Sequence, residues 1–302
     1  NIINIENISW KIKKIEIFTD NLENEKILKF DNKDQLFSII KNYKLYDNLN
    51  KILLNSKFFK KKINLKNKID FSKYNLVINT DYLSGLTNKY FNKKILKKYN
   101  SKAYITIFKH NKIQNDVAVQ IFTKNGPLAF LPISKNETSI VYSIHNSKNK
   151  LKDDICDLIQ TYNYKYKIEK IKQFETFELK SVSLRSYYNK NILAFGDLLH
   201  RVHPLAGQGF NMTIRDLKTL IQIIKEKINL GLPLDVSVNE EFEKKLKHKN
   251  YIFSSGIDLI HEFFNLERKF NNNILSKSLK IISHNPTINK AFKRIADTGE
   301  LF

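Results

Sequence analysis

Hydrophobic residues along this chain follow two different periods, and the period changes from one segment to the next. Short β-prone runs bounded by polar turns predict strands. The predicted strands are residues 14–18, 26–30, 76–78, 103–108, 117–122, 128–133, 139–144, 168–177 and 191–195. Apolar residues at a spacing near 3.6 predict helices. The predicted helices are residues 37–54, a stretch from Leu86, 151–162, a stretch from about Asn211 to before Gly231, 239–265 and 271–296.

The turns between the strands predict how some of them pair. Residues 21–24 form the turn of a pair made by the first two strands. Asn125-Gly126, followed by Pro127, is a strong turn signal within the stretch of residues 102–143. We therefore expect the four strands of that stretch to form an antiparallel meander, with the helix after it packed against the sheet.

The composition predicts a globular protein with a large core. The chain has 302 residues, of which 42% are hydrophobic. No apolar run approaches the roughly 18 residues that span a bilayer, and the N-terminus lacks the pattern of a secretory signal. We therefore expect a cytoplasmic protein. The lone Cys156 excludes a disulfide framework and is interpreted as a small core residue.

The net charge of +22 comes almost entirely from lysines spread along the chain. Nucleic-acid sites tend to cluster arginine and aromatic residues on one element. No such cluster occurs here, so no nucleic-acid partner is expected. A solvated surface is the simplest explanation of the lysines, and peripheral contact with an anionic membrane, such as the inner membrane, is the alternative.

The start of the chain is unusual, because residue 1 is Asn and the only methionine is Met212. A complete translation product begins with Met. We therefore interpret the chain as a fragment or a processed form that lacks a segment in front of Asn1.

Glycine is scarce in this chain, with 8 residues, yet the only Gly-x-Gly pair lies in the segment 196–216. A predicted strand leads into Gly196-Asp197, which places a carboxylate at the edge of a sheet where α/β folds bind ligands. Pro204 stiffens the next loop, Gly207 and Gly209 remove side chains, and a helix N-terminus follows with free N–H groups. The segment predicts a site for a planar or anionic polar group, although Gly-Asp alone is more often a turn or a cap.

A metal site is the competing interpretation of this segment. Asp197, His200 and His203 are spaced three residues apart, which suits a ligand set only on a helix. Pro204 and the glycines after it favour a loop, so no metal is expected. His200 is instead interpreted as a hydrogen-bonding residue that braces the loop.

The whole pattern is Gly-Asp-x-x-His-x-x-x-Pro-x-x-Gly-Gln-Gly-x-Asn-x-x-x-x-Asp, from Gly196 to Asp216. It resembles the second FAD-binding motif of the class A flavin monooxygenases. Within that class it is most similar to the ubiquinone-biosynthesis aromatic-ring hydroxylases, the polyprenyl-phenol hydroxylase family. The runs from His203 to Gly209 and from Gly126 to Pro132 are also typical of that family.

The resemblance implies an α/β fold with a Rossmann-like FAD-binding domain of the p-hydroxybenzoate hydroxylase type. An antiparallel-sheet substrate domain and C-terminal helices would complete it. The implied division is a strand pair at 1–33, an incomplete FAD-binding domain at 34–100 and 179–230, a substrate domain at 101–178 and a helical region at 231–302.

The resemblance also implies an FAD-dependent oxidoreductase. NAD(P)H would reduce the FAD, and O2 would then be used to hydroxylate the ring of a polyprenylated phenol in ubiquinone biosynthesis. Asp197 would hydrogen-bond the ribityl chain, and the helix N-terminus after Gly207 would face the pyrimidine edge of the flavin, where negative charge accumulates. No catalytic residue is assigned, because the flavin carries the chemistry. The implied cofactor-binding residues are Gly196, Asp197, Pro204, Gly207, Gln208, Gly209, Phe210, Asn211 and Asp81.

Two departures from the family pattern keep an alternative open. The family opens with a Gly-x-Gly-x-x-Gly loop for the FAD diphosphate, whereas the first glycine here is Gly85. The family also has an Ala-Asp-Gly-x-x-Ser motif, which corresponds to the region of residues 79–84 of this chain. Asp81 of that motif is present, but Tyr82 replaces the glycine that follows it, which weakens the prediction of NAD(P)H use. We expect weak FAD binding by this chain alone. The alternative is a degenerate, non-catalytic relative that serves as a scaffold or partner in a ubiquinone-biosynthesis complex.

Overall fold

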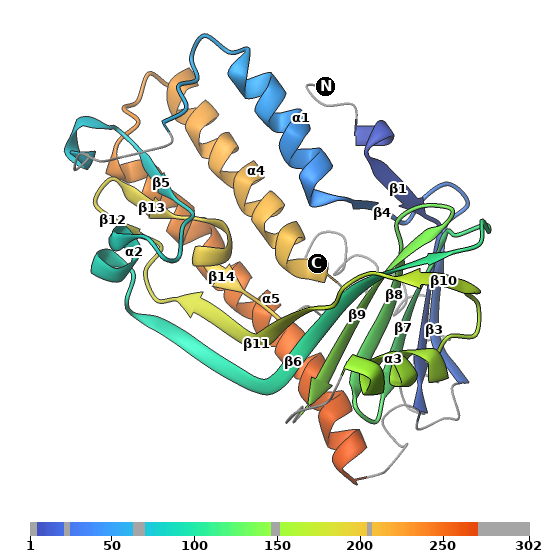
Figure 1. Ribbon diagram of the computed structural model, residues 1–302. Helices are drawn as coiled ribbons and strands as arrows, with labels where there is room; N and C mark the ends of the chain where they lie inside the picture. The colour runs from blue at the N-terminus through green and yellow to red at the C-terminus, as the bar shows by residue number, and fades with distance from the viewer. Residues whose placement is uncertain (1–4, 21–24, 63–69, 146–151, 204–206, 271–302) are drawn as a thin grey trace. The chain divides into compact units, whose positions relative to one another are not determined.

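The computed structural model describes the chain except for residues 1–4, 21–24, 63–69, 146–151, 204–206 and 271–302 (Figure 1). The chain divides into two compact units, and each unit is discontinuous in sequence. The first unit comprises Asn1–Leu65, Asn100–Glu178 and Phe264–Lys290, and the second comprises Lys66–Tyr99, Leu179–Phe263 and Ala291–Phe302. Strands β6 (Lys94–His110) and β11 (Glu175–Leu184) each run from one unit into the other.

A twisted sheet is the main feature of the first unit (Figure 1). From β6 outward its strands follow the order β9 (Glu137–His145), β8 (Gly126–Pro132), β7 (Val117–Thr123), β2 (Lys14–Thr19) and β3 (Glu25–Asp31), while β10 (Ile168–Ile171) also pairs with β6. The meander is confirmed for β7, β8 and β9. The first strand of the predicted meander, β6, lies beside β9 instead of β7.

The N-terminal strand pair extends this same sheet. β2 pairs antiparallel with β3, as predicted, and its other edge runs parallel to β7. This differs from the predicted division, which set residues 1–33 apart. The physical reason is that an isolated two-stranded hairpin is only marginally stable in water, so the pair gains by joining a larger sheet.

Residues 37–54 were predicted as one helix, and this prediction is wrong for the first four residues. β4 (Phe37–Ile40) pairs antiparallel with β1 (Ser9–Ile12), and helix α1 (Asn42–Leu54) begins only after it. Three of the four residues in this segment are apolar, and a segment this short fits both periods, so distant pairing with β1 decides the structure. A short 3-10 helix, η1 (Ile5–Asn7), precedes β1.

The core of the first unit lies between the sheet and helix α3 (Lys152–Thr161). Ile155 and Ile159 of α3 are fully buried and pack with Phe108, Leu128 and Tyr142 of the strands. Cys156 is only partly buried, so its interpretation as a core residue is wrong. The helical period places Ile155 and Ile159 on the buried face and leaves Cys156 beside it.

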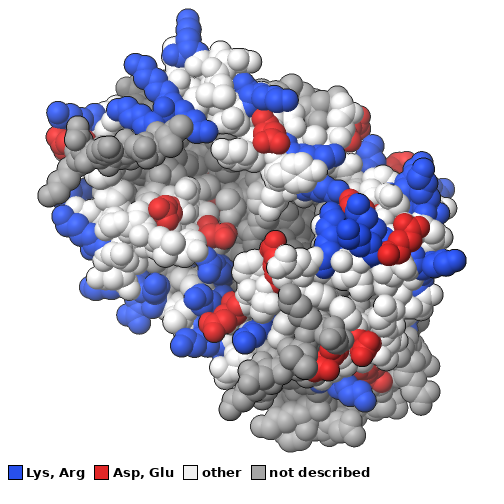
Figure 2. Space-filling view, viewed as in Figure 1, with Lys and Arg blue, Asp and Glu red and all other residues white. Residues whose placement is uncertain are grey.

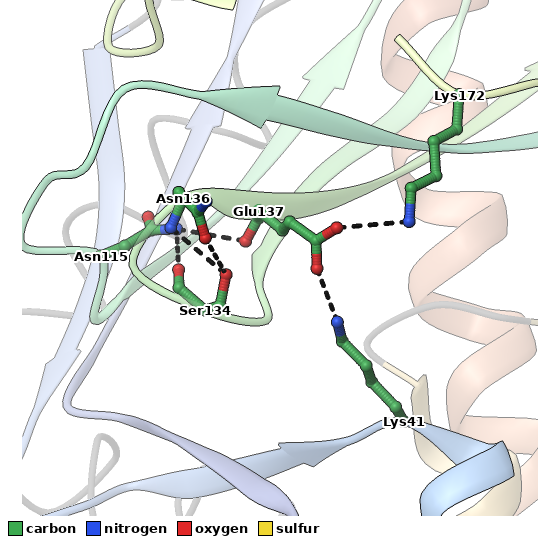
Figure 3. Close-up of polar contacts among 6 residues, drawn as sticks. All are labelled: Lys41, Asn115, Ser134, Asn136, Glu137 and Lys172. Atoms are coloured by element: carbon green, nitrogen blue, oxygen red, sulfur yellow. Dashed lines mark hydrogen bonds and ion pairs between the residues drawn. The ribbon is translucent and has the colours of Figure 1, made fainter. Parts of the chain in front are cut away.

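One carboxylate ties three distant segments of the first unit together (Figure 3). Glu137, at the start of β9, accepts a hydrogen bond from Lys41 Nζ at 2.6 Å and forms an ion pair with Lys172 Nζ at 3.2 Å. The hydrogen bond from Lys41, aided by Lys172, holds the pKa of the Glu137 carboxyl below its ordinary value. The adjoining turn is closed by Asn115, whose Nδ2 donates to the Ser134 carbonyl at 2.9 Å.

The second unit contains a small mixed sheet. β13 (Ile192–Ala194) runs parallel to β5 (Val77–Asn79) and antiparallel to β12 (Tyr188–Asn189). The pair of β11 with β14 (His200–Arg201) belongs to this unit as well. Short helices η3 (Phe71–Lys73), α2 (Gly85–Tyr90) and η4 (Gly196–Leu198) flank these strands.

Two long helices cover the core of the second unit. α4 (Gln208–Asn229) buries Leu220 and Ile223, and α5 (Val236–Phe270) buries Val238 and Phe242 against the strand residue Leu193. α4 begins three residues before the predicted Asn211, because Gly207 adopts the left-handed conformation (φ +65°) at its N-cap. The predicted helix over residues 271–296 lies outside the described residues.

Candidate functional site

The two parallel strands β5 and β13 of the second unit end at one edge of their sheet. Ala194 of β13 is opposite Asn79 of β5, and the N–H of Phe195 donates to the Asn79 carbonyl at 2.9 Å. Asp81 follows β5 and Asp197 follows β13. Both carboxylates therefore belong to the loops at the carboxyl edge, where open α/β sheets bind ligands.

Asp197 is an unused acceptor at this edge. It lies in the first turn of η4, directly after Gly196, whose φ of +66° favours glycine. The Asp197 side chain is exposed and makes no hydrogen bond or ion pair with any residue that the structure describes. Its carboxylate is therefore available to a ligand that carries hydroxyl groups.

The carboxylate of Asp81 has a different environment, because it helps to close its own loop. Asp81 Oδ1 accepts from the N–H of Leu83 at 2.8 Å, and Thr87 Oγ1 donates to the Asp81 carbonyl at 2.6 Å. Ser84 caps α2 by accepting from the N–H of Thr87. Asp81 thus shapes the loop first and has less capacity left for a ligand.

Tyr82, which stands where the family has glycine, lies against the glycine-rich segment 196–216. The guanidinium of Arg201 in β14 is 5.1 Å from the centre of the Tyr82 ring. This cation–π contact joins the Asp81 loop to the glycine-rich segment. Local pattern gave no signal for it, because the two residues are far apart in the chain.

The N-terminus of α4 offers free backbone donors. Gly207 at the N-cap has no side chain to satisfy them, and the first-turn residues Phe210 and Asn211 are exposed. Asn211 Nδ2 approaches Gln208 Oε1 at 3.5 Å, and Gly209 lies in the same turn. The partial positive charge of a 22-residue helix favours an anionic or electron-rich group here. Pro204, the remaining predicted site residue, lies outside the described residues.

His200 braces this segment, as its interpretation required. Its Nε2 is 2.5 Å from Oδ2 of Asp216 on α4, and Asn250 Nδ2 of α5 donates to the other oxygen, Oδ1, at 3.1 Å. Asp216 is fully buried, so both oxygens need these partners. Asn250 was missed by sequence reasoning, because nothing in its local pattern distinguishes it from other helical asparagines.

His203 is buried, and neither of its ring nitrogens has a hydrogen-bond partner among the residues that the structure describes. Its ring lies 4.8 Å from the Tyr99 ring and 4.4 Å from the His261 ring, measured between centres. Burial lowers the pKa of His203 to about 3, and the neighbouring His261 and Lys97 act in the same direction. His203 is therefore neutral at physiological pH.

Within the described residues, no three His, Cys, Asp or Glu side chains are grouped to hold a metal ion.

The residues present fit the flavin end of FAD. The exposed, unpartnered carboxylate of Asp197 suits ribityl hydroxyls, and the uncapped N-terminus of α4 suits the electron-rich edge of a flavin ring. Gly207 has open space where a side chain would stand, since a Cβ there would meet nothing within 4 Å. Contact of these residues with FAD stays a prediction.

Comparison with known proteins gives a family match and curated relatives. Residues 105–230 match the family model of an FAD binding domain. The 3-demethoxyubiquinol 3-hydroxylase of Escherichia coli K12 is 28% identical over 163 residues, covering 49% of this chain and 40% of that protein. The mitochondrial ubiquinone biosynthesis monooxygenase COQ6 of Drosophila melanogaster is 26% identical over 221 residues, covering 60% and 46%. The chain thus spans less than half the length of these relatives.

Solved structures share the fold. The p-nitrophenol 4-monooxygenase PnpA of Pseudomonas putida DLL-E4 superposes with a TM-score of 0.73 at 9% identity, covering 97% of this chain and 83% of that chain. HpxO of Klebsiella pneumoniae, solved with FAD and uric acid, has a TM-score of 0.69 at 11% identity, covering 96% and 81%. At such identities the similarity concerns the fold alone.

The fold is therefore that of the FAD-dependent monooxygenases of the p-hydroxybenzoate hydroxylase type, as predicted. The curated relatives confirm the narrower resemblance to the ubiquinone-biosynthesis aromatic-ring hydroxylases. The family model, together with a structural neighbour that holds FAD, supports FAD as the cofactor.

Proposed function

We propose that this chain forms part of an FAD-dependent hydroxylase that acts on the aromatic ring of a polyprenylated phenol in ubiquinone biosynthesis, using NAD(P)H and O2. One observation carries the proposal: a free carboxylate, Asp197, and an uncapped helix N-terminus, at Gln208, belong to the same glycine-rich segment. The names of the curated relatives supply the pathway.

The roles of the residues follow from their chemistry. Asp197 accepts hydrogen bonds from the ribityl hydroxyls, and the first-turn N–H groups of α4 face the pyrimidine edge of the flavin. Gly207 and Gly209 would keep side chains away from the ring, and Phe210 and Asn211 belong to the same first turn of α4. When bound, FAD would accept electrons from NAD(P)H and pass them to O2. His200, Asp216 and Asn250 hold the segment in place.

Replacement of Asp197 tests the proposal. Asp197→Ala should raise the Kd for FAD at least tenfold, because a hydrogen bond to a charged group is worth about 1.5–3 kcal/mol. Flavin fluorescence quenching during titration measures this. Asp157→Ala, which removes an exposed carboxylate from α3, is the matched control and should leave the Kd unchanged. Equal Kd values for Asp197→Ala and the parent would remove Asp197 from the site.

A non-catalytic scaffold is the second candidate, and Tyr82 favours it. Its ring, held against Arg201, occupies the position of a family glycine next to the Asp81 loop. If the scaffold role is correct, FAD-dependent NAD(P)H oxidation is absent in the parent. Oxidation by the parent speaks for the enzyme, whereas oxidation by Tyr82→Gly alone shows that Tyr82 blocks the reaction in this chain.

We also propose a cytoplasmic protein that contacts the inner membrane peripherally, because the polyprenyl substrate is a lipid. None of the helices in the described parts of the chain combines the length and the apolar character needed to cross a bilayer. The basic residues after residue 270 lie outside the described residues. Sedimentation with acidic vesicles at low salt should carry the protein down, and a protein that stays in solution would oppose membrane contact.

A further inference from the structure

A concave surface lies in the second unit, and none of the residues predicted for the flavin line it. It is a groove of about 750 Å³, a volume within the range of small-molecule sites. Its walls come from the start of β6, the end of β11 with the turn after it, and one face of α5. The residues that line it are Ile95, Ser183, Leu184, Arg185, Tyr187, Tyr188, Glu240, Glu243, Lys244, Lys247, His248 and Tyr251.

The groove contains two carboxylates, Glu240 and Glu243, and Glu243 already has hydrogen-bond partners at both oxygens. Glu243 Oε2 accepts from the backbone N–H of Tyr187 at 2.8 Å, and Glu243 Oε1 accepts from Lys247 Nζ at 2.6 Å. These contacts neutralise Lys247 and fix the turn that carries Arg185. Neither group is therefore free to attract a ligand.

The remaining cations have no such partners. Arg185 on one wall and Lys244 on the other make no side-chain hydrogen bond or ion pair within the described part of the chain, and the same holds for His248. Only Glu240 opposes them, so the unpaired groups leave a net positive charge in the groove. A guanidinium and an ammonium that both line one groove are the two side-chain groups that proteins use to bind phosphate.

The apolar part of the groove suits a flat ring. Tyr251 is 58% exposed and Ile95 is 50% exposed, although both are large apolar side chains. Tyr188, which is partly buried, also lines the groove. Exposed tyrosine faces stack on nucleobases without much preference for sequence.

We propose that this groove binds a nucleotide, with the phosphate between Arg185 and Lys244 and the base on Tyr251. The chemistry is shared by a free nucleoside diphosphate and by the adenosine end of a nicotinamide dinucleotide. The proposal does not rest on the proposed function, since the flavin residues take no part in it.

Calorimetric titration of the whole chain with ADP, NADPH and pyrophosphate tests the proposal. ADP should bind more tightly than pyrophosphate, because only ADP has a ring to stack. Arg185→Gln combined with Lys244→Gln should weaken ADP binding at least tenfold, the loss expected for charge-assisted hydrogen bonds. Glu240→Gln should strengthen it, since it removes the opposing charge. If NADPH binds with the same Kd as ADP, a nicotinamide dinucleotide can be the ligand of the groove.

Two control variants show whether the effect is specific to this groove. Lys225→Gln, an exposed lysine of α4, should leave ADP binding unchanged, and so should Asp197→Ala, which affects only the flavin site. The proposal is overturned if ADP does not bind at millimolar concentration, if the double variant binds as well as the parent, or if acidic vesicles bind to the groove in place of ADP. Glu240→Gln keeps the test decisive should the double variant fail to fold.

Discussion

At the residue scale, three acidic and basic side chains near the glycine-rich segment differ in how much of their hydrogen-bonding capacity the protein uses. Asp216 has partners at both oxygens and is fully buried. Asp197 has none within the described residues but is exposed to solvent. His203 is 1% exposed, and its two ring nitrogens have no hydrogen-bond partner in the described part of the chain. The first arrangement stabilises the fold, the second is open to a ligand, and the third costs stability.

His203 should make the protein sensitive to acid. Its folded-state pKa of about 3 lies below the value of about 6.5 expected in the unfolded chain. Only the unfolded state takes up the proton between these values, so stability is lost as pH falls below about 6.5. The loss at pH 5 should be about 2 kcal/mol.

Thermal unfolding of His203→Phe checks this expectation. The aromatic replacement keeps the contacts with Tyr99 and His261 but cannot take up a proton. Its Tm should fall less between pH 7 and pH 5 than that of the parent. Parallel pH profiles for the two proteins would show that another group is responsible.

The candidate site could be predicted in part from these residues. The carboxyl-edge position of Asp197 follows from a strand that ends in Gly-Asp, and the bracing role of His200 follows from a loop that contains proline and glycine. The place of Asp81 at the same edge is a finding of the structure. Asn250 and the Tyr82–Arg201 contact could not be predicted, because they depend on packing between segments that local periodicity does not relate.

At the element scale, a glycine stands at the turn between β7 and β8 of the large sheet. Gly126 joins β7 to β8 with φ +135°, and a Cβ at this position would lie 2.0 Å from the Ser143 carbonyl oxygen on β9. The neighbouring atom is backbone and cannot move away alone. Glycine is therefore required by the close approach of two strands, as the turn signal at Asn125-Gly126 indicates.

Gly126→Ala should destabilise the protein by about 3 kcal/mol or more, because it adds both a clash and a strained φ. Gly85→Ala is the matched control, since a Cβ at Gly85 would meet nothing within 4 Å at the start of α2. The control should change stability by about 1 kcal/mol at most, in the stabilising direction. Urea unfolding of both variants measures the difference, and similar losses would contradict the assigned role of Gly126.

Local sequence patterns predict only some of the strand neighbours in the large sheet. Alternating residues in β7, β8 and β9 predict both the strands and their order, because short turns join them. The place of β6 beside β9, and of β2 beside β7, is set by which faces the core buries, and that choice involves distant segments. Residues 37–40 became a strand for the same reason.

At the scale of the whole molecule, the chain passes between its two units within β6, within β11 and within α5. No cut in the sequence would separate the units, so both must be tested in the intact chain. Lysine and arginine side chains are spread over the face shown in Figure 2, with acidic groups between them. The absence of a nucleic-acid partner stays a prediction.

The central claim is that the segment from Gly196 to Asn211 holds the flavin end of FAD. Riboflavin tests it most directly, because it carries the ring and the ribityl chain but no phosphate or adenosine. Titration of the intact chain, followed by flavin fluorescence, should show saturable binding that Asp197→Ala weakens about tenfold or more. Riboflavin that fails to bind, or that binds the parent and Asp197→Ala equally well, would contradict the claim.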